Sequence, residues 1–432
     1  MRMPLFYTLL FYLSVPLILL RLLWRSIKAP QYRQRWSERF GYLPSHISRP
    51  QTQPLLWLHT VSVGETIAAK PLVDALLEQY PEYCLLITTM TPTGSAQVKK
   101  QFATVMDDGN IMHCYIPYDL PDCVARFLTG TQPQLAIFME TEVWPNILGA
   151  CQRHNIPTLL VNARLSERSF NGYQKFLWLT GSVFSRLSAI AAQNEGDARR
   201  LQDLGAPKPL VTGSLKSEIT ISDKLQKAAQ QLKSDWSLGG QHKIIIAAST
   251  HEGEDEIILS AYQQMLSADA SLLLVLAPRH PERFNRVNQL CLDQGFSVQR
   301  RSANTHVVSK TQIILADTIG ELMLLYGVAD IAIIGGSFVA HGGHNMLEPA
   351  AWGLPIVSGP SVFNFAKIAQ DMQERKGLLV VEQTSVLSEE LITLLTDANQ
   401  RKVIGNNAKE YLDHSKGALS KTMKIINRYV SM

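Results

Sequence analysis

The sequence GGSFVAHGGHNMLEPA, residues 335–350, directly follows the apolar run Ile331–Ile334. Two glycine pairs flank a short loop, and glycines let a backbone approach a ligand closely. We expect a strand, a glycine loop and then a helix that begins at Pro349. Proline suits the first position of a helix, because the N–H group that it lacks would have no partner there. A helix N-terminus after a glycine loop is a typical phosphate site. Glu348 at the helix mouth would hold ribose hydroxyls, which predicts a nucleotide-sugar site rather than a dinucleotide site.

The size and charge of the chain restrict its class. A chain of 432 residues is too long to fold around one hydrophobic core of ordinary size, so two domains are expected. A hydrophobic content of 46% indicates a globular chain, and a formal net charge of +4 is too small to indicate nucleic-acid binding. The five cysteines form no CxxC pair, which argues against a zinc or redox motif and is typical of reduced core cysteines.

The N-terminus is predicted to be a membrane anchor, residues 1–25. Residues 5–20 are almost wholly apolar, and Leu22–Leu23 extend the run toward the roughly 20 residues that cross a bilayer. Basic residues follow, among them Arg21 and Arg25, and positive flanks stay on the cytoplasmic side. A helix lying in the membrane interface is the alternative. A signal peptide is disfavoured, because no small-residue cleavage site follows.

Beyond the anchor, short apolar runs alternate with helical stretches. This alternation predicts parallel sheets covered on both faces, in two doubly wound Rossmann-like α/β domains that face a cleft. The domains would span residues 26–212 and 213–432, with the boundary near Gly213. The expected strands are 55–59, 84–88, 111–116, 135–139, 158–161 and 189–192, then 243–248, 272–277, 312–315, 331–334 and 355–357. Ligands of such sheets bind outside the carboxyl ends of the strands.

Two acidic motifs stand at such strand ends in the first half. In VSVGE, residues 61–65, Glu65 precedes a helix expected at 66–79. It would act as a general base or stabilise the helix dipole. In ETEVWPN, residues 140–146, Glu140 and Glu142 would accept hydrogen bonds from sugar hydroxyls or stand at a helix mouth.

Two further motifs follow strands in the second half. Ser249 and Thr250, in STHEGE, would cap the next helix or hold a phosphate. Arg279 and His280, in PRHPER, lie between prolines, and a stiff loop that carries arginine suits bidentate phosphate recognition. The alternative for that loop is a solvated surface turn.

Other chemistries find little support. His341 and His344 lack a third ligand at suitable spacing, so no metal site is predicted. Neither GxGxxG after the first strand nor GxxxxGK[ST] is present, which argues against dinucleotide chemistry and ATP hydrolysis.

Together the motifs resemble the 3-deoxy-D-manno-octulosonic acid (Kdo) transferase family of lipid A glycosyltransferases. The resemblance extends from about residue 20 nearly to the C-terminus. The matching segments are VSVGE (61–65), TTMTPTGS (88–95), ETEVWPNIL (140–148), NARLSERS (162–169), STHEGEDE (249–256), PRHPERF (278–284), GGSFVAHGGHNMLEPA (335–350) and Asn364–Phe365.

The resemblance implies a GT-B fold with an acceptor-binding N-terminal domain and a donor-binding C-terminal domain. The donor would be CMP-Kdo. The acceptor would be lipid IVA, the tetraacyl disaccharide bisphosphate precursor of lipid A, in lipopolysaccharide biosynthesis at the bacterial inner membrane. Family membership further implies inversion at the anomeric carbon, with no metal and no cofactor.

Roles transfer to matching residues. The resemblance makes Glu65 the general base, Arg279 the ligand of the CMP phosphate and Glu348 the ribose contact. Ser249, Thr250, His280, Gly335, Gly336, Ser337, Gly342, Gly343, His344 and Asn345 would complete the donor site. Ser62, Gly64, Glu140, Glu142, Arg33 and Arg35 would contact the acceptor. Lys216 matches a family lysine near the hinge, although Ser217-Glu218 departs from the expected aromatic-acid pair.

Two rival functions remain at this point. One is another GT-B enzyme with a UDP-sugar donor, such as a hexosaminyltransferase or an epimerase. The other is a non-catalytic membrane-bound module that binds nucleotides or lipids. The complete set of motifs argues against the second, because a degenerate homologue would have lost some of them.

Overall fold

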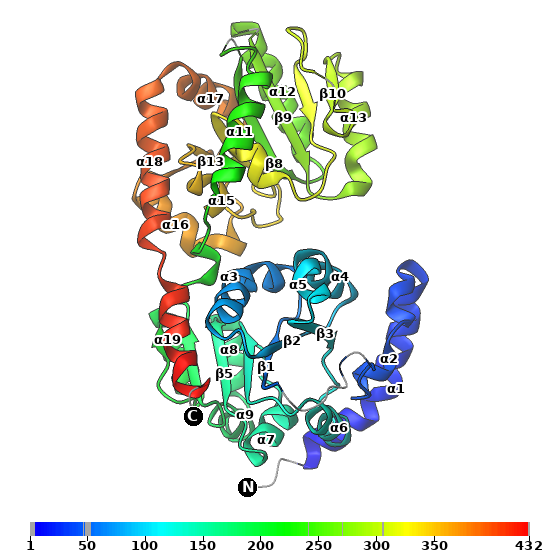
Figure 1. Cartoon of the computed structure of the whole chain (residues 1–432). Helices are drawn as coiled ribbons and strands as arrows, with labels where there is room; N and C mark the ends of the chain where they lie inside the picture. The colour runs from blue at the N-terminus through cyan, green and yellow to red at the C-terminus, as the bar shows by residue number, and fades with distance from the viewer. Residues whose placement is uncertain are drawn as a thin grey trace. The chain divides into compact units, whose positions relative to one another are not determined.

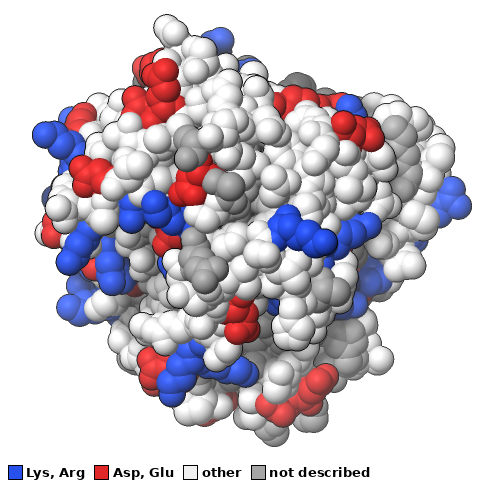
Figure 2. Space-filling view, turned by 90° about the horizontal axis from the view of Figure 1, so that it is seen from above, with Lys and Arg blue, Asp and Glu red and all other residues white. Residues whose placement is uncertain are grey.

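The computed structural model of the chain describes residues 5–45, 47, 53–240, 242–269, 271–304 and 306–430. The chain divides into two compact units (Figure 1). The first comprises Met1–Glu218 together with Lys416–Met432, and the second comprises Ile219–Ser415. Residues 1–4 of the predicted anchor lie outside the described residues. On the face shown in Figure 2, basic and acidic side chains are interspersed, as the small net charge suggests.

The first unit is built on a seven-stranded parallel sheet in the order β3-β2-β1-β4-β5-β6-β7. The strands are β1 Leu55–His59, β2 Cys84–Thr89, β3 Ile111–Tyr115, β4 Leu135–Met139, β5 Thr158–Ala163, β6 Ala189–Ala192 and β7 Leu210–Val211. Strands β1 and β4 are buried along their whole length, which explains their continuous apolar sequences. The centre of the sheet carries Trp57, whose ring packs on Phe127 and Phe138.

The second unit repeats this design, with the order β10-β11-β9-β8-β12-β13-β14. The strands are β8 Lys243–Thr250, β9 Leu272–Pro278, β10 Val298–Arg300, β11 Ile313–Leu315, β12 Ile331–Ile334, β13 Ile356–Ser358 and β14 Leu378–Val380. All pairs are parallel, and β8 lies between β9 and β12. The predicted doubly wound α/β class is thus confirmed for both units. Each sheet also has short strands that the sequence did not predict, namely β7, β10 and β14.

Helices cover both sheets. Those of the first unit are α1 Leu5–Lys28, α2 Trp36–Arg39, α3 Val63–Gln79, α4 Pro92–Gln101, α5 Ala103–Asp107, α6 Pro121–Thr131, α7 Pro145–Arg153, α8 Glu167–Gln174, α9 Leu177–Phe184, α10 Glu195–Asp203 and α19 Ala418–Val430. Those of the second are α11 Asp223–Trp236, α12 Glu254–Ala268, α13 Phe284–Asp293, α14 Leu322–Val328, α15 Leu347–Ala351, α16 Ala366–Glu374, α17 Leu387–Thr396 and α18 Ala398–His414.

The last helix, α19, belongs to the first unit, whereas the sequence placed residues 213–432 together. Four of its apolar side chains join the core formed by β1, β2 and α3; these are Ala418, Met423, Ile425 and Ile426. Glu218 holds the start of the helix, because one carboxylate oxygen accepts hydrogen bonds from the N–H groups of Gly417 and Leu419 at 2.8 and 3.0 Å. The unusual Ser217-Glu218 pair therefore has a structural use.

Helix α1 is long and apolar enough to cross a membrane over Tyr7–Ile27, judged by length and composition. One face nevertheless packs on the globular unit, since Phe11, Val15 and Ile18 contact the cluster around Tyr118. The Tyr7 hydroxyl donates to Asp119 at 2.9 Å. The rest of the helix exposes large apolar side chains, namely Leu9, Leu10, Leu13, Leu17, Leu20, Leu23, Trp24 and Ile27.

Candidate active site

Glu65 lies in the first turn of α3, because the helix begins at Val63 rather than at the expected residue 66. Its Oε2 accepts a hydrogen bond from the Val61 N–H at 2.8 Å, and its Oε1 accepts one from the Ser62 hydroxyl at 3.2 Å. These bonds turn the carboxylate back toward the carboxyl end of β1. A Cβ at Gly64 would meet nothing closer than the Ser62 hydroxyl at 4.0 Å, so no close contact requires a glycine at this position.

Three carboxylates influence one another at the ends of the neighbouring strands β1 and β4. Burial and the charge of Glu140 raise the pKa of Glu65, while the Val61 N–H opposes the shift. Burial and the nearby Glu65 raise the pKa of Glu142 to about 7, against a 2.9 Å hydrogen bond from the Trp144 indole. Glu65 is therefore a stronger proton acceptor than a free carboxylate, as a general base requires.

Glu140 is held differently. It is 4% exposed and its backbone has a φ of 57°, so the chain turns sharply at the end of β4. Its carboxylate pairs with Arg164 at 2.7 Å and with Lys216 at 3.1 Å. These partners offset the negative charge next to Glu65, and they give Lys216 a defined place. Glu140 thus orders the site, and its oxygens are engaged before any sugar arrives.

The two predicted basic contacts also differ from each other. Arg35 has a left-handed backbone with a φ of 59°, and its guanidinium pairs with Glu38 at 2.6 Å and donates to the Ser95 hydroxyl at 2.8 Å. The same group stacks on the Tyr115 ring. Arg35 thus ties the N-terminal segment to β3. Arg33 remains exposed, with its Nε donating to the Ser26 hydroxyl at 2.7 Å.

The raised pKa of Glu142 gives a stability prediction. Between its unfolded value of 4.5 and the folded value of about 7, the folded chain binds more protons than the unfolded chain. The stability contributed by this group is therefore full below pH 4.5 and is lost as the pH rises through 7. We expect the free energy of unfolding of Glu142→Gln to fall by about 2 kcal/mol less than that of the unaltered chain as the pH rises. The measurement is the thermal midpoint at pH 5 and pH 8, with exposed Glu167→Gln as control; equal pH dependence in both variants would contradict the shift.

In the second unit, Glu254 organises the glycine loop. Its fully buried carboxylate accepts hydrogen bonds from the N–H groups of Gly336, Ser337 and Phe338 at 2.6, 3.0 and 2.9 Å. It also accepts one from the His251 N–H at 2.9 Å. Gly336 and Ser337, which were expected in the donor site, thus direct their amides to an internal carboxylate. The loop after β12 is held in shape before any donor binds.

The glycines of this loop have separate structural reasons. A Cβ at Gly335 would lie 2.3 Å from the Ser249 carbonyl oxygen, so the backbones of β8 and β12 could not approach so closely. Gly336, Gly342 and Gly343 have φ values of 70°, 83° and 71°, which L side chains rarely adopt. The Gly342 N–H donates to the Ser361 hydroxyl and the Gly343 N–H to the Gly336 carbonyl.

Thr250 belongs to β8 and does not cap α12, contrary to one of the two interpretations. Its hydroxyl donates to Asp255 at 2.6 Å, and Asp255 pairs with Arg283. The next helix begins at Glu254 after Gly253, and Ser249 has a φ of 62°. Neither hydroxyl residue therefore serves as an N-cap.

Arg279 and His280 follow β9 and are exposed. The Arg279 N–H donates to the Thr250 carbonyl at 3.0 Å, which fixes the loop on β8. Burial and the charge of Arg279 lower the pKa of His344 to about 4. The ring centroid of His280 lies 5.4 Å from that of His251, whose Nε2 atom contacts Nε2 of His344. Arg279 and the glycine loop are thus brought together at one end of the second sheet.

Histidines gather at the same place. The Nε2 atoms of His251 and His344 share a hydrogen bond at 2.8 Å, and the His251 ring stacks on that of His341 with centroids 4.1 Å apart. Burial and the neighbouring His341 lower the pKa of His251 to about 4, so the pair is neutral at pH 7. Among the described residues, no group of three or more His, Cys, Asp or Glu side chains is arranged to hold a metal ion.

Glu348 lies in α15, which begins at Leu347, so Pro349 occupies the third position of the helix rather than the predicted first. A proline is still accommodated there, because N–H groups of the first turn have no partner within the helix. Asn345 donates its side-chain amide to Glu348 Oε1 at 3.0 Å. Burial raises the pKa of Glu348, against this bond and the charge of Arg279. The charge of Arg279 thus acts on this carboxylate, and the role of Glu348 as a ribose contact stays a prediction.

Sequence reasoning missed two residues with clear roles here, Glu254 and Arg164. Both lie inside segments that were recognised, STHEGEDE and NARLSERS. The sequence around a single acidic or basic residue does not predict which residue it binds, however. The partners of Glu254 lie 82 to 84 positions further along the chain, apart from His251.

The chain was compared with known proteins. Residues 34–219 match a family described as "3-Deoxy-D-manno-octulosonic-acid transferase (kdotransferase)", and residues 242–411 match "Glycosyl transferases group 1". A 3-deoxy-D-manno-octulosonic acid transferase of Haemophilus influenzae is 42% identical over 428 residues, 98% of each chain. The chain belongs to the Kdo transferase family. A transferase of Bordetella pertussis with the same description is 33% identical, covering 94% of this chain and 96% of its own.

Membership makes the chain a glycosyltransferase with Kdo transferase function, as the resemblance implied. Solved structures agree on the fold. A UDP-GlcNAc 2-epimerase of Neisseria meningitidis has a TM-score of 0.56 at 14% identity, covering 87% of this chain and all of its own. A glycosyltransferase of Rickettsia africae has a TM-score of 0.55 at 14% identity, covering 88% and 99%. The GT-B fold expected from the sequence is therefore confirmed.

Proposed function

We propose that this family member transfers Kdo from CMP-Kdo to lipid IVA, with inversion and without a metal ion or cofactor. Membership of the Kdo transferase family supports Kdo as the sugar that is transferred. The observation that carries the chemistry is Glu65, a carboxylate with a raised pKa that the Val61 N–H holds at the end of β1.

In the proposed reaction, Glu65 removes the proton from an acceptor hydroxyl. The hydroxyl oxygen forms a bond to the anomeric carbon of Kdo, while the bond from that carbon to the CMP phosphate oxygen breaks and CMP leaves. A single displacement inverts the anomeric centre. CMP is already a good leaving group, so one positioned base is the main proton-transfer group required.

The second unit would hold the donor. Exposed Arg279 supplies positive charge for the CMP phosphate, in place of a metal ion. Glu348 would accept hydrogen bonds from the ribose hydroxyls, and His280, His344 and Asn345 would surround the phosphate and the Kdo carboxylate. The proposal requires this donor to meet Glu65 of the first unit during the reaction.

Helix α1 would place the enzyme on the cytoplasmic face of the bacterial inner membrane. One side of the helix packs on the globular unit through Phe11, Val15 and Ile18, and its outer side is rich in leucine. A helix with one protein-covered face suits the interface better than a free crossing of the bilayer. Exposed Arg33 would lie near anionic headgroups or the phosphates of the acceptor.

The direct test is transfer by the purified chain, with products identified by mass spectrometry. We expect lipid IVA to gain the mass of Kdo with CMP-Kdo, also in the presence of EDTA, and no sugar from UDP-GlcNAc or UDP-glucose. Transfer from a UDP-sugar alone would replace this function with that of another GT-B enzyme. Loss of transfer in EDTA that added Mg²⁺ restores would contradict metal independence.

A further inference from the structure

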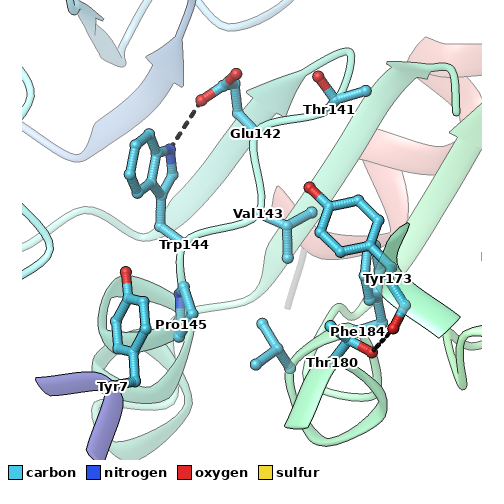
Figure 3. Close-up of a pocket in the computed structure, with 10 residues that line it drawn as sticks. Tyr7, Thr141, Glu142, Val143, Trp144, Pro145, Tyr173, Thr180 and Phe184 are labelled. Carbon is cyan, nitrogen blue, oxygen red and sulfur yellow. Dashed lines mark hydrogen bonds between the residues drawn. The ribbon is translucent and has the colours of Figure 1, made fainter. Parts of the chain in front are cut away.

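A cavity of about 410 Å³ lies within the first unit, next to Glu142 (Figure 3). Its volume falls within the roughly 300–1,000 Å³ typical of small-molecule sites. The lining residues come from α1, from the segment between β4 and α7, and from α8 and α9; they are Tyr7, Thr141, Glu142, Val143, Trp144, Pro145, Tyr173, Thr180, Val183 and Phe184. None of the roles assigned above, apart from that of Glu142, uses this cavity.

The inner wall of the cavity is apolar. Val143, Val183 and Phe184 supply aliphatic and aromatic surface. Three polar groups of the lining have partners within the chain: the Tyr7 hydroxyl donates to Asp119, the Trp144 indole N–H donates to Glu142, and the Thr180 hydroxyl donates to the carbonyls of Tyr173 and Phe176. A ligand part that forms no hydrogen bonds fits such a lining best.

The cavity borders two apolar surfaces of the same unit. On one side, α1 contributes Tyr7 to the lining and exposes the neighbouring Leu9 and Leu10, at 60% and 56%. On the other side, α8 and α9 contribute Tyr173 and Thr180, and Phe176, which precedes α9, and Leu177, which begins it, are 56% and 44% exposed. If α1 lies in the membrane interface, lipid chains reach the cavity along apolar surface on both sides.

The polar end of the cavity is Glu142, whose charge interacts with that of Glu65. A molecule with an apolar tail in the cavity would therefore carry its polar head toward the proposed base. An amphiphile with a sugar head and a hydrocarbon tail has this shape.

We infer that the cavity holds one fatty-acyl chain of the lipid acceptor and thereby sets which acylated acceptors are accepted. This inference rests on the proposed function, and it adds the subsite that recognises the lipid part. Seating one chain against Val143 and Phe184 brings the attached sugar to Glu65. The remaining chains stay in the bilayer, because a cavity of this size accommodates a single chain.

The first experiment fills the cavity from two sides, with Val143→Phe and Thr180→Phe. Both residues line the cavity and are only partly buried, so larger side chains there take up cavity volume. We measure KM for lipid IVA and for the same disaccharide bisphosphate without acyl chains. Each variant should raise KM for lipid IVA at least tenfold more than KM for the acyl-free acceptor. Val403→Phe, at a 56% exposed site on α18, is the matched control and should alter neither value.

The second experiment needs no activity. A lysophospholipid with a brominated acyl chain quenches tryptophan fluorescence on contact, and Trp144 lines the cavity. Because Trp24 on α1 is also exposed, the signal is the difference between the unaltered chain and Trp144→Phe. We expect this difference to fall at least threefold in Thr180→Phe and to be unchanged in Val403→Phe.

The two experiments separate the possible failures. Equal KM changes for both acceptors, or no quenching that depends on Trp144, would overturn the acyl site even if Kdo transfer is efficient. Quenching that depends on Trp144 and on an open cavity, in a chain that transfers no Kdo, would remove the proposed function and leave a site for a single acyl chain.

Discussion

Replacement of Glu65 by glutamine is expected to lower kcat for Kdo transfer by 10²–10⁴-fold, the range typical of a lost general base. Glutamine keeps the size of the side chain and can still accept from the Val61 N–H, so the start of α3 should remain intact. It cannot take a proton from the acceptor hydroxyl, however. Donor affinity should stay within twofold, because the residues proposed to bind the donor belong to the other unit.

The measurement combines steady-state transfer rates with calorimetric binding of CMP. Glu78→Gln is a matched control, since Glu78 is an exposed glutamate of the same helix. In the unaltered chain, kcat/KM should rise with pH through a pKa above 4.5, because Glu65 acts only when ionised and its pKa is raised. A Glu65→Gln enzyme with more than a few per cent of the activity would show that another group takes the proton.

Replacement of Glu254 by alanine is expected to lower CMP affinity at least 100-fold and to destabilise the second unit. The change leaves four N–H groups without their acceptor, those of His251, Gly336, Ser337 and Phe338. Each buried N–H group left without an acceptor lowers the stability of the fold by about 1–3 kcal/mol, so the loop should lose its folded conformation. Glu254→Gln should have an intermediate effect, because its NH₂ group would face N–H donors on one side.

Calorimetry with CMP and the thermal midpoint of each variant provide the test. Glu252→Gln is the control, since Glu252 lies two positions away, is 66% exposed and pairs with exposed Arg286 at the surface. If Glu254→Ala folds and binds CMP normally, the glycine loop does not form the donor site, or Glu254 does not hold it. Circular dichroism distinguishes a variant that binds poorly from one that is unfolded.

The central strands of both sheets could be predicted because burial on two faces requires apolar runs, as in Leu135–Met139 and Ile331–Ile334. The short strands β7, β10 and β14 have two or three residues, and Gln299-Arg300 in β10 is polar, so no such pattern marks them. The motifs also predict roles for Glu65 and Glu348, and these roles stay predictions.

The internal partners of the site residues could not be predicted. The stacking of Arg35 on Tyr115 and the bonds of Glu254 join segments far apart in the sequence. In each case a local pattern shows that a charge is present, and only the fold shows what that charge binds. The placement of α19 in the first unit is of the same kind, because its apolar face is compatible with either sheet.

That placement affects how the chain is made. Domains generally fold in the order in which they leave the ribosome. Here the first unit emerges early, yet its core includes Met423, Ile425 and Ile426, and these residues are synthesised after the second unit. The first unit therefore keeps an uncovered apolar surface beside α3 until the second unit and then α19 have been translated.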